Sequence, residues 1–139
     1  MKKLWIFAII CALLAYFVLP AAAMHHEVKI TEQSGIGRYL TDTEGMTLYT
    51  FQKDSVGHSA CSGSCVNNWP VYYREQVAPP PDLKAADFVT ITREDGAKQT
   101  TFRGYPLYYY KGDTAAGETK GNGIMDLWHV VDPDHFPPM

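Results

Sequence analysis

The chain lacks the signatures of several common classes of protein. It has no run of lysine and arginine, and its 139 residues carry a formal net charge of −3, so we expect no nucleic-acid partner. The Gly-x-Ser-x-Gly elbow, the His-Glu-x-x-His zinc motif and a phosphate-binding glycine loop are all missing. The Cys-x-x-Cys-His motif of covalently attached haem is missing too. We therefore predict that the protein is not an enzyme.

Long apolar runs are also lacking, except at the N-terminus. Lys2 and Lys3 precede an apolar run over 4–19, and Pro20 and the three alanines 21–23 follow it. This order is typical of a cleavable secretory signal. As a helix the run would span about 24 Å, less than the roughly 30 Å of a bilayer core. We expect a signal peptide over 1–23 and a periplasmic or secreted domain over 24–139 without a membrane span. If the signal is not cleaved, the protein is membrane-anchored.

Cysteine is scarce, with three residues in the chain. Cys11 lies in the middle of the apolar run after Ile10, whereas a lipoprotein signal needs a small residue before a cysteine at the end of the run. We expect no lipid, and loss of Cys11 with the signal. Cys61 and Cys65 remain, and outside the cytoplasm such a pair is interpreted first as a disulfide. Metal ligation and thiol redox chemistry are the alternatives. Redox chemistry is less favoured because thiol oxidoreductases use Cys-x-x-Cys at a helix N-terminus, whereas Gly63 and the flanking serines indicate a loop.

An internal repeat determines the expected architecture. A shift of 59 residues aligns the chain with itself without a gap. Eight pairs of residues coincide in this alignment: Gly37 and Gly96, Thr41 and Thr100, Gly45 and Gly104, Leu48 and Leu107, Tyr49 and Tyr108, Asp54 and Asp113, Trp69 and Trp128, Val71 and Val130. Two copies are too few for a solenoid. They predict a pseudo-twofold domain in which each copy covers the apolar face of the other.

Short strands are predicted from β-branched and aromatic runs bounded by turn residues. They lie over 45–51, 88–92, 104–110 and 127–131, with a hairpin turn at 94–96, a proline linker at 79–81 and one helical turn within 82–87. With 11 glycines and 9 prolines, the sequence favours strands and loops over long helices. We predict an all-β or β-rich fold: one small domain of two pseudo-twofold-related repeats, over about 27–80 and 86–139, with short antiparallel strands.

The repeated unit is Tyr-x-aromatic-x-x-Asp, followed by a tryptophan 15 residues after the aspartate. Since residues i and i+2 of a strand share a face, each copy presents two aromatic rings on one side. The aspartate follows at the end of the strand, where its carboxylate can accept bonds from turn N–H groups. A cysteine loop fills the interval to the tryptophan in the first copy, and a glycine-rich loop over 117–123 fills it in the second.

These motifs resemble a bacterial secreted repeat family of unknown function, whose members are often described as predicted lipoproteins with a Tyr-x-(Phe/Trp/Tyr)-x-x-Asp motif. The resemblance extends over 45–133 and includes the Cys61–Cys65 loop, Trp69-Pro70, Asp113, Gly117 and Trp128. It implies an extracytoplasmic location and a repeat architecture, and it brings no activity. The missing lipoprotein signal is a departure from the family pattern.

Two interpretations of the repeated unit stay open. The aromatic rings can be core residues and the aspartates turn caps, which is favoured because each copy needs its own turn. Alternatively, the sets line a ligand site between the copies. The candidate binding residues are Tyr49, Phe51, Asp54, Trp69, Tyr108, Tyr110, Asp113 and Trp128. The leading hypothesis is a non-catalytic binding or interaction module with an unknown protein or small-molecule partner.

The histidines suggest a second hypothesis. Cleavage after Ala23 would leave a terminus with His25 and His26, where an amine, two backbone amides and an imidazole can bind Cu(II) or Ni(II) in a square plane. The same residues can be a solvated terminus. His58, His129 and His135 are scattered. Periplasmic copper or haem handling, associated with electron transfer, is therefore the second hypothesis, with haem held non-covalently by His or Tyr, and a thiol redox protein is the third. No cofactor is predicted firmly.

Overall fold

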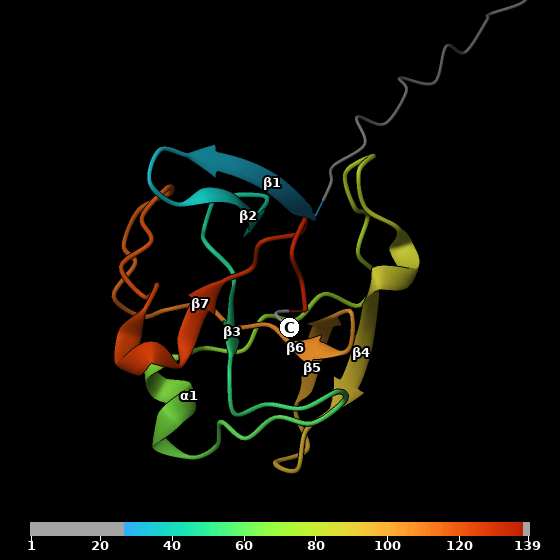
Figure 1. Cartoon of the computed structure of the whole chain (residues 1–139). Helices are drawn as coiled ribbons and strands as arrows, with labels where there is room; N and C mark the ends of the chain where they lie inside the picture. The colour runs from blue at the N-terminus through green and yellow to red at the C-terminus, as the bar shows by residue number, and fades with distance from the viewer. Residues whose placement is uncertain (1–26, 138–139) are drawn as a thin grey trace, which may run out of the picture.

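The computed structural model describes residues 27–137; the predicted signal, His25 and His26 lie outside the described residues. The strands in chain order are β1 Val28–Gln33, β2 Gly37–Asp42, β3 Tyr49–Phe51, β4 Phe88–Thr92, β5 Lys98–Phe102, β6 Tyr105–Pro106 and β7 Trp128–Val130 (Figure 1). A five-residue helix, α1 Ser64–Asn68, and two 3-10 turns, η1 Ala85–Asp87 and η2 Ile124–Asp126, complete the fold. The β-rich prediction is confirmed. Within the described part of the chain, no helix is long and apolar enough to cross a membrane.

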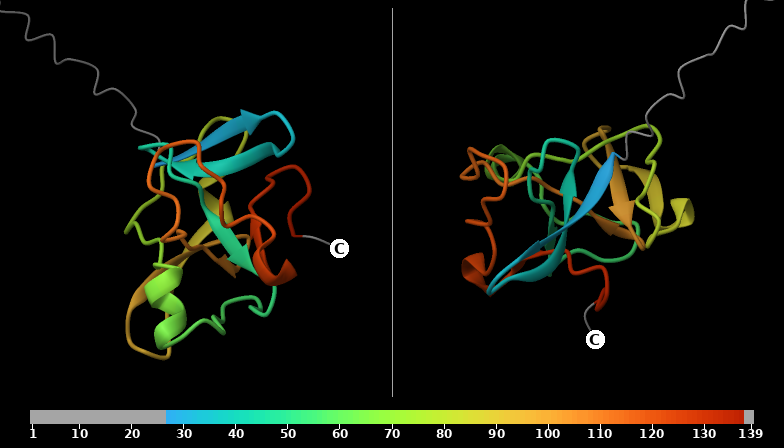
Figure 2. Two further views of the ribbon diagram at one scale, coloured as in Figure 1. Left: turned by 90° about the vertical axis from the view of Figure 1, so that its left-hand side faces the viewer. Right: turned by 90° about the horizontal axis from the view of Figure 1, so that it is seen from above.

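Two antiparallel hairpins occupy corresponding places in the two copies. β1 pairs with β2, and β4 pairs with β5, which also pairs with β6. The turn predicted at 94–96 joins β4 and β5, and it is closed by the Gly96 N–H, which donates to the Arg93 carbonyl at 2.9 Å. The hairpin β1–β2 and the sheet β4–β5–β6 lie apart, with β3 and β7 between them (Figures 1 and 2).

The central strands are shorter than the sequence predicts. Of the strand expected over 104–110, two residues form β6, because beyond Pro106 the chain leaves the hairpin. Tyr108 then makes isolated bridges to Tyr49 and to Val71. The loop expected around Gly63 contains α1, which begins at the following residue. At Tyr108, bridges to the other copy replace a regular strand, and at Ser64 a short helix replaces the expected loop.

The copies are interlocked rather than side by side. β3 of the first copy pairs with β7 of the second, with Tyr49 opposite Val130. Tyr108 of the second copy faces Val71 of the first, which is the equivalent pair under the shift of 59 residues. Each copy thus completes the strand pairing of the other.

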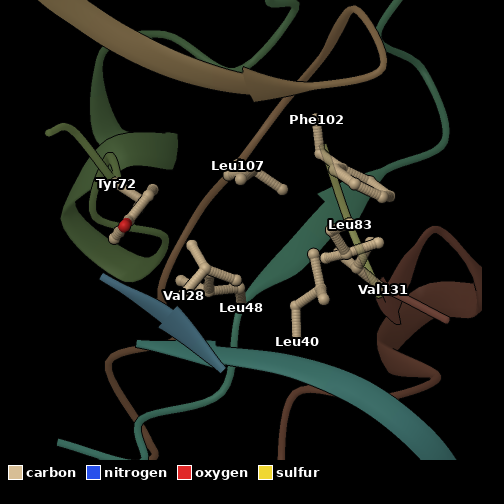
Figure 3. Close-up of a cluster of buried hydrophobic side chains, with 8 residues drawn as sticks. All are labelled: Val28, Leu40, Leu48, Tyr72, Leu83, Phe102, Leu107 and Val131. Carbon is tan, nitrogen blue, oxygen red and sulfur yellow. The ribbon is translucent and has the colours of Figure 1, made fainter. Parts of the chain in front are cut away.

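The main hydrophobic core draws on both copies. Its buried members are Val28, Leu40, Leu48, Tyr72, Leu83, Phe102, Leu107 and Val131 (Figure 3). Leu48 and Leu107 are equivalent under the shift, and both are fully buried. A second cluster, around the tryptophans, has the buried members Tyr49, Cys61, Trp69, Tyr108 and Trp128.

Candidate functional site

The repeated tyrosines and aspartates bond across the copies. The Tyr49 hydroxyl donates to Oδ2 of Asp113 at 2.6 Å, and the Tyr108 hydroxyl donates to Oδ2 of Asp54 at 2.7 Å. Each tyrosine therefore reaches the aspartate of the other copy, not the one five residues later in its own motif. This exchange fixes how the two copies sit on each other.

Each aspartate also closes its own turn. Oδ1 of Asp54 accepts from the Ala60 N–H at 2.6 Å, and Oδ1 of Asp113 accepts from the Lys120 N–H at 2.9 Å. Burial raises the pKa of both carboxyls, while these N–H groups and the two phenols act to lower it. Burial also raises the pKa of both tyrosines, so the phenols keep their protons and act as donors at neutral pH.

Four aromatic rings form a continuous column between the copies. Trp69 and Trp128 stack at a centroid distance of 3.8 Å with an interplanar angle of 1°. Phe51 stacks on Trp128 at 4.2 Å, and Tyr110 stacks on Trp69 at 4.5 Å. The two tryptophans are 6% and 3% exposed. The rings therefore fill the space between the copies, which is where the alternative interpretation of the motif put a ligand site.

The rings of Tyr49 and Tyr108 close the sides of the column. Tyr49 lies edge-on to Trp69 at 5.5 Å, and Tyr108 lies edge-on to Trp128 at 5.1 Å. We call these six rings and the two aspartates the joint; it contains all eight candidate binding residues. Aromatic pairs of this kind stabilise a fold by about 0.5–1.5 kcal/mol each beyond their burial.

The two loops of the repeat support the joint in different ways. The predicted Cys61–Cys65 disulfide is present, with the Cα atoms 5.4 Å apart, and Cys61 is fully buried against the joint. In the second copy Gly121 packs there instead. A Cβ atom at Gly121 would lie 2.9 Å from ring atoms of both Trp69 and Tyr49, so this position requires glycine.

A buried arginine, not expected from the sequence, ties the second copy to the disulfide loop. The Arg93 side chain is 3% exposed. Its guanidinium donates to Ser59 Oγ at 2.8 Å, to Gln99 Oε1 at 2.8 Å and to the Cys61 carbonyl. Arg93 follows a strand of mixed polarity, and no local pattern distinguishes it from a surface residue.

A cavity of about 530 Å³ lies beside the joint. It is lined by β3, β7, β6 and the segment after β7, through Thr50, Phe51, Gln52, Asp54, Tyr105, His129, Val130, Asp132, His135 and Phe136. Of the eight candidate binding residues, Phe51 and Asp54 line this cavity. The cavity was not predicted, because its walls come from segments far apart in the sequence.

The C-terminal wall of the cavity is held by two arginines. Arg103 donates to the carbonyls of Pro133 at 3.0 Å and Phe136 at 2.7 Å. Arg38 donates to both carboxylate oxygens of Asp134 at 2.9 Å. These bonds fix the segment 132–137 beside β3 and β6, where Figure 1 draws the last described residues in red.

The ionisable side chains of the cavity include two carboxylates, Asp54 and Asp132, and two imidazoles, His129 and His135. Oδ2 of Asp132 lies 2.8 Å from Nδ1 of His135, and its Oδ1 accepts from the Asp134 N–H at 2.9 Å. Burial acts to raise the pKa of Asp132, but the bonds from His135 and Asp134 outweigh it, and the pKa is lowered. The bond to Asp132 raises the pKa of His135. No lysine or arginine lines the cavity.

The described residues do not form a metal-binding site. Among residues 27–137, no group of three or more His, Cys, Asp or Glu side chains is placed to hold a metal ion. Nε2 of His129 lies 3.3 Å from the Asp126 carbonyl, and Nε2 of His58 lies 3.9 Å from Glu94. His129 and His135 both line the cavity, whereas His58 is not among its lining residues.

Crossed strand pairing and exchanged Tyr–Asp bonds define a β-rich domain of two interlocked repeats. The sequence agrees, because the model of a family described as "Secreted repeat of unknown function" matches residues 31–72 and 89–132. The chain belongs to this family, and the resemblance noted from its motifs is confirmed. Both matched segments lie within the repeats predicted from the sequence. Comparison with curated proteins and with solved structures finds no match.

Proposed function

We propose that the protein is a non-catalytic extracytoplasmic binding module, and that the cavity beside the joint is its ligand site. The observation that carries this proposal is the composition of the cavity wall. It combines aromatic rings from both copies with the carboxylates of Asp54 and Asp132. Ligand sites are typically concave and largely apolar, with a few polar groups that orient the ligand.

The joint itself supports this function by holding the cavity in shape. Its phenols and carboxylates already bond to each other, and its tryptophans are buried. Phe51 packs on Trp128 and also lines the cavity, so one wall of the site is fixed by the column of rings. A preformed site binds with a smaller loss of conformational entropy than a flexible one.

The other hypotheses from the sequence receive no specific support within residues 27–137. The disulfide packs against the joint through the buried Cys61, which is a structural position. Copper at the terminus concerns His25 and His26, which are outside the described residues. We therefore propose binding alone, without a chemical step.

The test is a cavity-filling substitution. Gln52 lines the cavity and is exposed, so Gln52→Trp should occupy part of it. Gln76 is also exposed and is not among the lining residues, which makes Gln76→Trp a matched control. The whole chain is expressed, and the protein is purified from the periplasm with ¹⁵N labelling.

A library of small fragments is then screened by NMR. We expect fragments that shift the amide signals of Thr50, His129 and Val130 in the wild type and in Gln76→Trp, and much less in Gln52→Trp. Fragments that shift only signals elsewhere, or act equally on both variants, would show that the cavity is not a ligand site.

A further inference from the structure

Three aromatic rings from three separate segments face the cavity. Phe51 belongs to β3, Tyr105 to β6 and Phe136 to the C-terminal segment. Tyr105 and Phe136 meet edge to face, with centroids 5.3 Å apart and planes at 89°, and so form a corner. Phe51 packs on Trp128, and among the described ring contacts it touches neither Tyr105 nor Phe136. The cavity occupies the space between the corner and Phe51.

The charges at the cavity favour a cationic ligand. Its carboxylates are Asp54 and Asp132, and its lining includes no lysine or arginine. The two arginines nearest to its C-terminal wall are engaged elsewhere: Arg103 bonds to backbone carbonyls and Asp87, and Arg38 bonds to Asp82 and Asp134. An anionic ligand would meet like charge from both carboxylates and no lysine or arginine, and of the two lining imidazoles, His129 and His135, the second is already paired with Asp132.

The hydrogen bonds that Asp54 and Asp132 already accept favour a cation without N–H donors. Each oxygen of Asp54 already accepts a bond, from the Ala60 N–H and from the Tyr108 hydroxyl. Each oxygen of Asp132 is also engaged, by His135 and by the Asp134 N–H. A primary ammonium group carries three N–H donors that would need acceptors. A quaternary ammonium group carries none, and it needs only nearby negative charge and aromatic faces.

We infer that the cavity binds a small organic cation with a quaternary ammonium group, held between Phe51, Tyr105 and Phe136 and balanced by Asp132 and Asp54. This inference rests on the proposed function, because it specifies the ligand class of the same cavity. The volume of about 530 Å³ suits such a cation, since small-molecule sites commonly span about 300–1,000 Å³. The face of an aromatic ring attracts a cation through its quadrupole, and several rings around one cation form an aromatic cage.

The test compares choline with its neutral isostere, 3,3-dimethyl-1-butanol, by titration calorimetry on the protein purified from the periplasm. The two molecules share size and hydroxyl group and differ in charge. We expect one choline per chain, bound at least about tenfold more tightly than the isostere. Equal affinity for the two molecules, or no binding of choline, would overturn the inference.

Two variants locate the binding. Tyr105→Leu removes one ring of the cage, and Tyr73→Leu is its matched control, since Tyr73 is also half-buried and does not line the cavity. We expect Tyr105→Leu to weaken choline binding several-fold and Tyr73→Leu to leave it unchanged. Asp132→Asn removes charge with little change of shape, and it should weaken binding of choline but not of the isostere. Thermal melting of each variant checks that it is folded.

Together, the choline and fragment experiments distinguish a wrong ligand class from a cavity that is not a ligand site. If choline does not bind while fragments bind in the cavity, the ligand class is wrong and the proposed function stands. If neither choline nor any fragment binds there, both proposals fail. If Tyr105→Leu and Asp132→Asn both bind choline as tightly as the wild type does, choline binds elsewhere, and the inference is overturned.

Discussion

Tyr49 and Tyr108, which are equivalent residues of the two copies, bond to each other through their backbones. The Tyr49 N–H donates to the Tyr108 carbonyl at 2.8 Å, and the Tyr108 N–H donates to the Tyr49 carbonyl at 3.0 Å. This reciprocal pair places the pseudo-twofold axis between them. From this pair of backbone bonds, each tyrosine side chain extends to the aspartate of the other copy.

The exchange of partners predicts a specific pattern of energetic coupling. We expect Tyr49→Phe and Asp113→Asn to be coupled by about 1–3 kcal/mol in the free energy of unfolding, because the pair is in direct contact and includes a charge-assisted bond. The matched pair Tyr49→Phe and Asp54→Asn, from one copy of the motif, should be nearly additive. Urea unfolding of the single and double variants gives both values. Stronger coupling within one copy than between copies would contradict the exchange.

The interlocked strands also predict that neither copy folds alone. Residues 24–80 lack the partner of β3, which is β7, and residues 81–139 lack the partner of Tyr108 at Val71. We expect each fragment to show no cooperative unfolding transition by circular dichroism. When the two are mixed, a one-to-one complex with a cooperative transition should form. A fragment 24–80 that unfolds cooperatively alone would contradict this interlocking.

Much of the architecture could be predicted from the sequence, and most of the site could not. Tyr49, Asp54 and Trp69 recur at constant spacing in the second copy, so the repeat and its short strands follow from local patterns. The spacing shows which residues are equivalent but not which copy supplies each partner, so the exchange of Tyr–Asp bonds was not predicted. The burial of Arg93 and the shape of the cavity depend on contacts between segments far apart in the chain. Local patterns in a single sequence do not indicate such contacts.

The disulfide should stabilise the fold because it restricts the conformations of the denatured chain. It closes a short loop, Cys61 to Cys65, and such a bridge contributes about 2 kcal/mol in the chain-entropy model. We expect the double variant Cys61→Ala, Cys65→Ala to lose about this much, and slightly more because Cys61 is buried. Urea unfolding of oxidised wild type and the variant measures the loss. A difference near zero would mean that the aromatic joint alone holds the loop.

Choline binding should depend on pH through His135. Its pKa is raised by the bond to Asp132 and by the charge of Asp134. Below this pKa the imidazolium places a positive charge beside Asp132 and repels a cation, and above it the neutral ring can still donate Nδ1–H to Asp132 but carries no charge. Affinity should therefore rise as the pH increases through the raised pKa of His135. His135→Gln should remove this rise, and His129→Gln, at the other histidine of the cavity, should preserve it. Titration calorimetry across this pH range checks both; a rise that persists in His135→Gln would contradict the assignment.

An NMR measurement of choline bound to the protein tests the proposed ligand site most directly. We predict nuclear Overhauser contacts between the choline methyl protons and ring protons of Phe51, Tyr105 and Phe136, together with shifts of the Thr50 and Val130 amides. Such contacts would place the cation between the three rings beside the joint. Contacts to other residues, or their complete absence at saturating choline, would contradict the claim that this cavity is the ligand site for an organic cation.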